Sequence, residues 1–193
     1  MPQLGILIAS TRPGRVAVPV GRWFQRKAEE DGRFQVTWID LAEINLPFLD
    51  EPHHPRLRRY VHEHTRRWSA LIDRMDAFVF VMPEYNHGFS AVLKNALDYL
   101  HHEWQFKPVG FVSYGGVSAG TRAVQMVKQV VAALKMVPIY EAVAIPFVQQ
   151  LIGEDGQFRP SEALDQAAAT LLDELARWEE ALRPLRSGAA ASS

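Results

Sequence analysis

The sequence contains no cysteine among its 193 residues. It therefore cannot form disulfides, thiolate zinc sites or iron–sulfur clusters, and it has no cysteine nucleophile. Any redox chemistry must come from a bound cofactor. An excess of charge of one sign is also missing, since 21 Lys and Arg stand against 22 Asp and Glu, for a formal net charge of -1. This balance does not indicate a nucleic-acid or membrane-surface partner, and we expect neither.

Long hydrophobic runs are absent as well. Residues 4–9 form a short apolar stretch with no basic residue before it, and no later run approaches the roughly 18 residues of a membrane helix. We therefore expect a soluble, cytoplasmic protein. Residues 187–193 are only Ser, Gly and Ala, too poor in apolar bulk to offset the entropy of ordering. The sequence predicts one domain over residues 1–186 and a disordered tail over 187–193.

Short apolar runs alternate along the chain with longer stretches of helical period. Three of the runs are nearly continuous, as is typical of central strands covered on both faces: residues 4–9, 77–82 and 109–112. Residues 34–38 alternate between apolar and polar side chains, which favours a strand nearer the edge of a sheet. Residues 138–145 supply a fifth candidate strand.

Between the predicted strands, apolar residues recur at spacings of three and four, as on one face of a helix. These stretches span residues 20–24, 61–75, 93–100, 124–134 and 164–182. We expect Ser161 to cap the last helix and Pro184 to follow it. Residues 41–58 lack a pattern and are expected to form a loop or lid. Strict alternation predicts a flavodoxin-like three-layer α/β sandwich with a parallel sheet in the order 2-1-3-4-5.

Three segments rich in glycine and polar residues directly follow predicted strands: residues 10–16, 83–90 and 113–120. The carboxyl ends of parallel strands share one edge of the sheet, and ligands bind there where the strand order reverses. We therefore expect the three loops to meet between the first and third strands.

The first loop suits a phosphate. Its polar side chains come from Ser10, Thr11, Arg12 and Arg15, and a helix starts just after them. Hydroxyls, guanidiniums and free N–H groups offer phosphate oxygens directed hydrogen bonds. A polar connecting turn with surface arginines remains an alternative. The loop lacks the glycine patterns of dinucleotide and triphosphate sites, which favours a mononucleotide, and so we interpret Asp40 as a strand-end cap rather than a ribose ligand.

The second loop and the next helix carry a specific signature. Pro83-Glu84-Tyr85-Asn86 and Leu93-Lys94-Asn95-Ala96-Leu97-Asp98 closely resemble the P-E-Y-N and L-K-N-A-[IL]-D motifs of the NADPH-dependent FMN reductases, which include quinone, azo-dye and chromate reductases. The resemblance extends from residue 4 to about residue 146. It implies FMN as cofactor, NADPH or NADH as co-substrate, and a homodimer or homotetramer with the helix over residues 90–101 as a candidate interface.

The same resemblance implies where FMN lies. Ser10, Arg12 and Arg15 would hold the phosphate, beside Thr11 and the helix start at Val16. Pro83, Glu84, Tyr85 and Asn86 would border the ring system, and Ser113, Tyr114, Gly115 and Gly116 would contact its pyrimidine edge. Many family members have a hydroxyl residue in place of Arg15. That side chain could donate to the phosphate itself, or point away and leave Thr11 and backbone amides to do so.

The third loop also matches the G-x-S-x-G nucleophile elbow of hydrolases, with Ser118 at its centre. In that fold the histidine of the catalytic triad follows the serine along the chain. All seven histidines precede Ser118, which argues against a hydrolase. We interpret the glycines as positions where the backbone can closely approach a planar ligand.

The histidines show no metal-binding pattern, and we expect no metal. His62 and His64 are two positions apart and should diverge on a helix, while His53–His54 and His101–His102 are adjacent pairs. The pair at 101 and 102 suits a helix carboxyl end. His87 lies within the second loop, where it would face either substrate or solvent.

A basic stretch comprises Arg56, Arg58, Arg59, Arg66 and Arg67. It would either bind the 2′-phosphate of NADPH or form a solvated helix face.

Together these observations predict an oxidoreductase. Hydride would pass from NAD(P)H to bound FMN and then to a small acceptor of the quinone, free flavin, azo or metal-oxyanion type, with donor and acceptor taking turns. A flavodoxin-type electron carrier and a flavin-free regulatory or scaffold protein remain alternatives.

Overall fold

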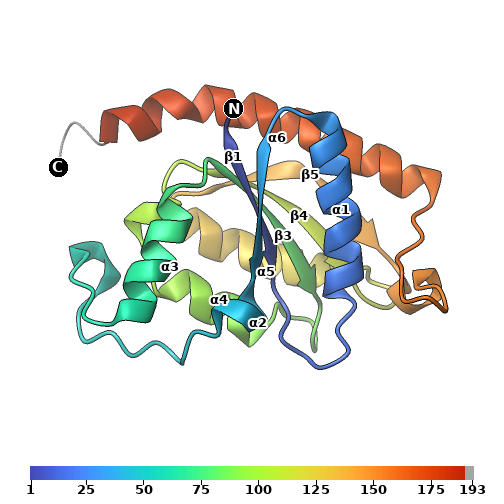
Figure 1. The fold of residues 1–193 in the computed structure, drawn as a ribbon, viewed down its shortest axis with the longest axis horizontal. Helices are drawn as coiled ribbons and strands as arrows, with labels where there is room; N and C mark the ends of the chain where they lie inside the picture. Colours follow the sequence, from blue (N-terminus) through green and yellow to red (C-terminus); the bar gives the residue numbers. More distant parts are fainter. Residues whose placement is uncertain (190–193) are drawn as a thin grey trace.

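The strands of the protein lie parallel in one five-stranded sheet, in the order β2-β1-β3-β4-β5 (Figure 1). They are β1 (Gln3–Ile8), β2 (Gln35–Asp40), β3 (Ala77–Pro83), β4 (Pro108–Tyr114) and β5 (Val137–Ile145). This computed structural model describes the backbone of residues 1–189. The predicted strand order is confirmed, and β2 is an edge strand, as its alternating pattern indicated.

Helices cover both faces of the sheet. They are α1 (Ala17–Asp31), α2 (Leu41–Ile44), α3 (Glu63–Asp73), α4 (Ala91–Asp98), α5 (Thr121–Ala133) and α6 (Glu162–Ala189), with short 3-10 turns η1 (Pro55–Leu57), η2 (His102–Trp104) and η3 (Val148–Leu151). Helices α1 and α6 pack on one face, and α3, α4 and α5 on the other (Figure 1). The predicted three-layer sandwich is therefore confirmed. Within residues 1–189, no helix is both long and apolar enough to cross a membrane.

Strand β3 separates two hydrophobic cores. Val79 and Val81 belong to the core under α1 and α6, whereas Phe78 and Phe80 belong to the core under α3, α4 and α5. Successive side chains of a strand point to opposite faces, so a central strand covered on both sides must be apolar at every position. Burial of each such side chain contributes about 1.5–3 kcal/mol.

Two polar side chains fix where helices begin at the carboxyl edge of the sheet. The Ser90 hydroxyl donates to the carbonyl oxygen of Ala9 at 2.6 Å and accepts from the N–H of Leu93 at 3.4 Å. It thereby joins the end of β1 to the start of α4. Asp40, which was predicted to cap the end of its strand, accepts from the N–H of Ala42 at 2.9 Å and caps the short helix α2, which was not predicted.

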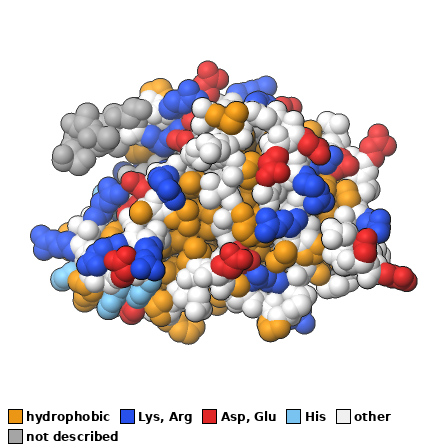
Figure 2. Space-filling model, viewed as in Figure 1, with side chains coloured by type: hydrophobic (Ala, Val, Ile, Leu, Met, Phe, Trp, Pro, Cys, Tyr) orange, Lys and Arg blue, Asp and Glu red, His pale blue; other side chains and the backbone are white. Residues whose placement is uncertain are grey.

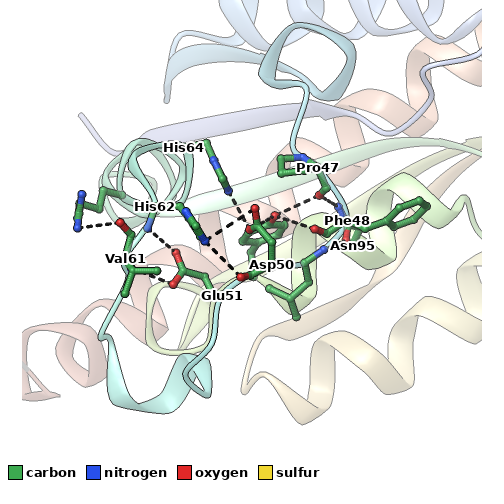
Figure 3. A network of polar contacts seen from close by, with 11 residues as sticks. Pro47, Phe48, Asp50, Glu51, Val61, His62, His64 and Asn95 are labelled. Atoms are coloured by element: carbon green, nitrogen blue, oxygen red, sulfur yellow. Dashed lines mark hydrogen bonds and ion pairs between the residues drawn. The ribbon is translucent and has the colours of Figure 1, made fainter.

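The segment predicted as a loop or lid, residues 41–58, contains the short helices α2 and η1 and is fastened to α4 (Figure 3). The Asn95 side chain donates to the carbonyl oxygen of Pro47 at 2.7 Å and accepts from the N–H of Leu49 at 3.0 Å. The Tyr99 hydroxyl donates to the Asp50 carboxylate at 3.0 Å. The lid is thus held in place by side chains of α4 and the residue after it.

The prediction that His62 and His64 diverge is wrong. Their rings stack with centroids 5.1 Å apart and 8° between planes. His64 Nε2 lies 3.0 Å from the Asp50 carboxylate, and His62 Nε2 lies 3.3 Å from the Asp50 carbonyl oxygen (Figure 3). His62 is the cap residue of α3 and has extended backbone angles, so the rotation between successive helical residues does not apply to it.

The last helix is longer than predicted. Pro184 lies inside α6 rather than after it, and residues 187–189, assigned to the predicted tail, belong to this helix. Arg186 fixes this end of α6 to the sheet, because its guanidinium donates to the carbonyl oxygen of Phe106 at 3.1 Å and pairs with the buried Glu179. The rest of the predicted tail, residues 190–193, lies outside the described residues.

Candidate functional site

A cavity of about 380 Å³ opens at the carboxyl edge of the sheet, a volume within the range of small-molecule sites. Four segments line it: Arg12, Gly14, Arg15 and Val16 after β1; Pro83, Glu84 and Tyr85 at the end of β3; Tyr114, Gly115 and Gly116 at the end of β4; and residues 147–150 after β5. The structure therefore brings together the three loops that the sequence placed at this edge.

The start of α1 forms one end of the cavity. Its cap residue Val16 makes no side-chain cap, and the first turn contains no acidic residue. The first N–H groups of α1 therefore point outward without a capping side chain, at the positive end of the helix dipole. Arg12 lies on the same wall, and its guanidinium has no hydrogen bond or ion pair with any residue that the structure describes. This end of the cavity suits an anion.

Arg15 lines the cavity but its guanidinium is already engaged. It donates to the carbonyl oxygen of Ser10 at 2.6 Å and forms an ion pair with the Asp40 carboxylate at 2.5 Å. The Asp40 side chain is only 4% exposed. The Arg15 side chain thus bridges the ends of β1 and β2, and its guanidinium is not free to serve as a separate anion-binding group.

Two other residues predicted to contact phosphate do not line this cavity. The Ser10 side chain is buried, and its hydroxyl lies 2.8 Å from the Tyr85 hydroxyl, within hydrogen-bonding distance. Thr11 lines a separate, smaller cavity of about 300 Å³ together with Leu41 and Asn45. The first loop therefore divides two cavities, with Arg12 on one side and Thr11 on the other.

The second loop is a tight hairpin. Tyr85 and Gly88 exchange two backbone hydrogen bonds of 2.9 and 3.0 Å, and both central residues have positive φ, 50° at Asn86 and 69° at His87. These angles are those of a type I′ turn, in which Asn is favoured. The turn exposes Asn86 and His87 at its tip, away from the cavity wall, and leaves Tyr85 on the wall.

The third loop supplies backbone rather than side chains. A Cβ atom on Gly116 would meet no atom within 4 Å, so a flat ligand can approach this backbone closely. Ser113 is buried and donates to the carbonyl oxygen of Ala119 at 2.9 Å, which holds the loop from behind. Burial and the nearby Tyr85 raise the pKa of Tyr114 above its usual range, so this cavity-lining phenol stays neutral.

Residues 147–150 form a fourth wall that the sequence analysis did not find. The N–H groups of Phe147 and Val148 donate to the carbonyl oxygens of Gly116 and Gly115, at 3.1 and 3.2 Å. This segment has neither the glycines nor the charges by which the other loops were selected. Its position after β5, at the same sheet edge, was the signal that could have identified it.

Ser118, the candidate nucleophile, has no histidine partner among the described residues. Its hydroxyl donates to Glu84 at 2.9 Å and accepts from Arg122 at 2.9 Å. Without a histidine of the described residues beside it, Ser118 is not arranged as the nucleophile of a Ser-His-Asp triad.

The basic stretch lies apart from the cavity, around α3, where Figure 2 shows arginine and histidine side chains gathered at the left of the molecule. Arg66 and Arg67 pair with Glu63 on the same helix, and Arg58 pairs with Asp73. This arrangement favours a solvated helix face. The described residues contain no group of three or more potential metal ligands.

Comparison with known proteins places these features in context. The model of the NADPH-dependent FMN reductase family matches residues 2–150. An NAD(P)H-dependent FMN reductase of Schizosaccharomyces pombe is 38% identical over 149 residues, which cover 75% of this chain and 74% of the relative. One of Saccharomyces cerevisiae is 34% identical over 145 residues, covering 69% and 75%. The structure of FerB, a flavoenzyme NAD(P)H:(acceptor) oxidoreductase from Paracoccus denitrificans, has a TM-score of 0.74 at 20% identity, covering 93% of this chain and 98% of that one.

Proposed function

The chain belongs to the NADPH-dependent FMN reductase family, and from this premise we propose that its cavity binds FMN and passes electrons from NAD(P)H to a flat, quinone-like acceptor. One observation carries the proposal: an anion-binding end with a free arginine and a glycine-lined wall lie in the same cavity. A nucleotide phosphate and a planar ring system require such a pair of surfaces.

The residues of the cavity fit FMN. The Arg12 guanidinium and the N–H groups at the start of α1 would hold the phosphate, because neither has a side-chain partner among the described residues. The backbone at Gly115 and Gly116 would border the ring, where no Cβ atom stands in the way. Tyr85 and Phe147 would form its aromatic walls and help to exclude water. When bound, FMN supplies the two-electron redox chemistry.

Donor and acceptor would use one space in turn. Tyr85 and Phe147 are 38% and 49% exposed, so their rings offer stacking surfaces to whichever flat partner enters. The chain's own role is then to position two rings against each other. This arrangement requires no general acid or base from the protein, and the described cavity wall contains neither a histidine nor a lysine.

We also propose a homo-oligomer with a contact at α4 and the lid. Ala91 and Lys94 are the exposed residues of α4, and residues 47–50 lie beside the helix. Phe48 and Leu49 in that segment are 85% and 43% exposed. Such apolar exposure supports burial against a second copy.

The test is a titration of the cofactor-free protein with FMN, followed by anaerobic addition of NADPH or NADH. We expect the bound-flavin absorbance to appear in the first step and to bleach in the second. Absence of FMN binding would contradict the proposal. Binding without bleaching by either nicotinamide would indicate an electron carrier instead.

A further inference from the structure

Glu84 lines the cavity, and its side chain is only 5% exposed. Arg122 contacts its carboxylate through three groups: the guanidinium Nε donates at 2.5 Å, the backbone N–H donates at 3.2 Å, and Nη2 forms an ion pair with it. The Ser118 hydroxyl donates to the same carboxylate at 2.9 Å. A buried carboxylate with several donors is held in one position.

This cluster ties two loops of the cavity together across the sheet edge. Glu84 directly follows β3. Ser118 lies in the loop after β4, and Arg122 lies in the first turn of α5. The cap residue of α5 is Gly120, which has no side chain to accept from the helix N–H groups. Glu84 takes over that role from a neighbouring loop, at the helix end where a negative charge is favourable.

The cluster contains one negative and one positive side chain, Glu84 and Arg122. Burial alone would raise the pKa of Glu84, but the hydrogen bonds from Arg122 and Ser118 outweigh it and lower the pKa below its usual range. The carboxylate is therefore ionised near neutral pH, on a residue that lines the cavity. Arg122, whose side chain is 47% exposed, forms an ion pair with it and balances its charge. An anion that forms in the cavity experiences both charges, and their sum decides whether it is stabilised.

We propose that Glu84 and Arg122, bridged by Ser118, form a charge-balanced clamp that sets the reduction potential of the flavin. This inference rests on the proposed function, because it requires FMN in the cavity. Two-electron reduction of flavin can leave a negative charge on the ring. Glu84 disfavours that charge and Arg122 offsets it, so the two residues act in opposite directions on the same equilibrium. Ser118 is a positioning residue, because its hydroxyl holds the Glu84 carboxylate and the Arg122 guanidinium together.

The test measures the flavin reduction potential of the FMN-loaded protein by anaerobic dye equilibration at pH 8. We expect Arg122→Met to lower the ratio of reduced to oxidised flavin at a given potential about tenfold, which is about 30 mV for a two-electron couple. Glu84→Gln keeps the shape of the side chain and removes its charge, and should shift the ratio about tenfold in the opposite direction. The double variant should return to within about threefold of the wild-type ratio.

Two further variants separate charge from shape. Arg122→Lys keeps the positive charge with fewer donors, and should stay within about threefold of the wild type. Arg177→Met removes an arginine from an exposed pair with Glu174 on α6 and should leave the potential unchanged. Shifts of the same sign in Arg122→Met and Glu84→Gln, or shifts below threefold in both, would overturn the inference while FMN binding by the wild type upholds the proposed function. Failure of the wild type to bind FMN would overturn both.

Discussion

The guanidinium of Arg15 forms an ion pair of 2.5 Å with the carboxylate of Asp40, and this bond joins the loop after β1 to the end of β2. The family resemblance assigned Arg15 to the phosphate. Its engagement with a nearly buried carboxylate leaves Arg12 as the cavity-lining arginine without a partner among the described residues. The two arginines of one loop thus differ in their contacts: Arg15 is held in an ion pair, and Arg12 lines the cavity with no partner for its guanidinium among the described residues.

Replacing Arg12 with alanine should weaken FMN binding by about 1.5–3 kcal/mol, or about 10- to 100-fold in Kd, because a charge-assisted contact to the phosphate is lost. Fluorescence titration with FMN measures the change. Arg58→Ala is the matched control, since Arg58 pairs with Asp73 and lies outside the cavity wall. Equal losses in both variants would refute the phosphate assignment.

Replacing Arg15 with serine should affect the stability of the protein more than its affinity for FMN. We expect FMN affinity to change less than in Arg12→Ala, while the free energy of unfolding of the cofactor-free protein falls by about 1–3 kcal/mol, because Asp40 is left buried without its partner. Urea denaturation measures the loss, and Asp40→Asn in the same chain should recover part of it. A larger loss of FMN affinity than in Arg12→Ala would show that Arg15 turns to the phosphate.

Tyr85→Ala should slow both reduction by NAD(P)H and oxidation by a quinone, by up to about 100-fold, because the ring helps to orient both partners. Stopped-flow measurement of each half-reaction tests this. In the wild type, steady-state kinetics with NAD(P)H and a quinone should give parallel double-reciprocal lines, as donor and acceptor use one space in turn. Intersecting lines would mean that both bind at once.

Lys107 should give the protein a distinctive dependence of stability on pH. Its side chain is buried and its Nζ donates to the carbonyl oxygens of Ile72 and Asp73 at 2.8 and 3.1 Å. Burial lowers its pKa to about 8, against the attraction of Asp73 and Asp76. Between that pKa and 10.5 in the unfolded chain, the unfolded state binds more protons, so stability rises with pH.

We therefore expect the wild type to gain stability relative to Lys107→Met between pH 8 and pH 10.5, by at most about 3 kcal/mol. Below pH 8 the difference should be constant. Urea denaturation across this range tests the expectation, with the exposed Lys94→Met as control. A constant difference throughout the range would show that Lys107 titrates as it does in the unfolded chain.

Phe48→Glu should dissociate or weaken the proposed homo-oligomer, because it places a charge in the contact at α4 and the lid. Light scattering coupled to size-exclusion chromatography measures the mass. Tyr140→Glu changes an aromatic residue of similar exposure, 88%, on the edge strand β5 and serves as control. A wild-type protein that is monomeric at all concentrations would contradict the proposal.

Much of the fold follows from the sequence for a simple physical reason. A strand such as β3 is apolar at every position because both of its faces are covered, so its continuous run identifies it as central. Alternation with helices then leaves few topologies. Two errors arose at helix boundaries: His62 is a cap rather than a helical residue, and Pro184 is accommodated inside α6 instead of ending it.

The site was predictable to the level of loops but not of side chains. Sheet topology placed the loops together, yet it could not tell that Thr11 faces a different cavity from Arg12. Asn86 lies at the exposed tip of a type I′ turn, away from the cavity wall, and the sequence analysis did not predict the positive φ angles of this turn. Phe147 was missed because hydrogen bonds to the glycine loop, rather than polar side chains, bring its segment to the cavity.

Helix α6 lies beyond the family match at residues 2–150, yet it covers β4 and β5. A Cβ atom on Gly110 of β4 would lie 3.0 Å from Leu171 of α6, so the absence of a side chain at this position lets the helix pack closely on the strand. A chain shortened to the matched region would retain every residue of the cavity wall and expose the apolar face that Leu171 and Leu175 now cover. The stable folded unit is therefore larger than the region that the family model matches, and we expect truncation at residue 150 to leave the cavity residues on an uncovered sheet.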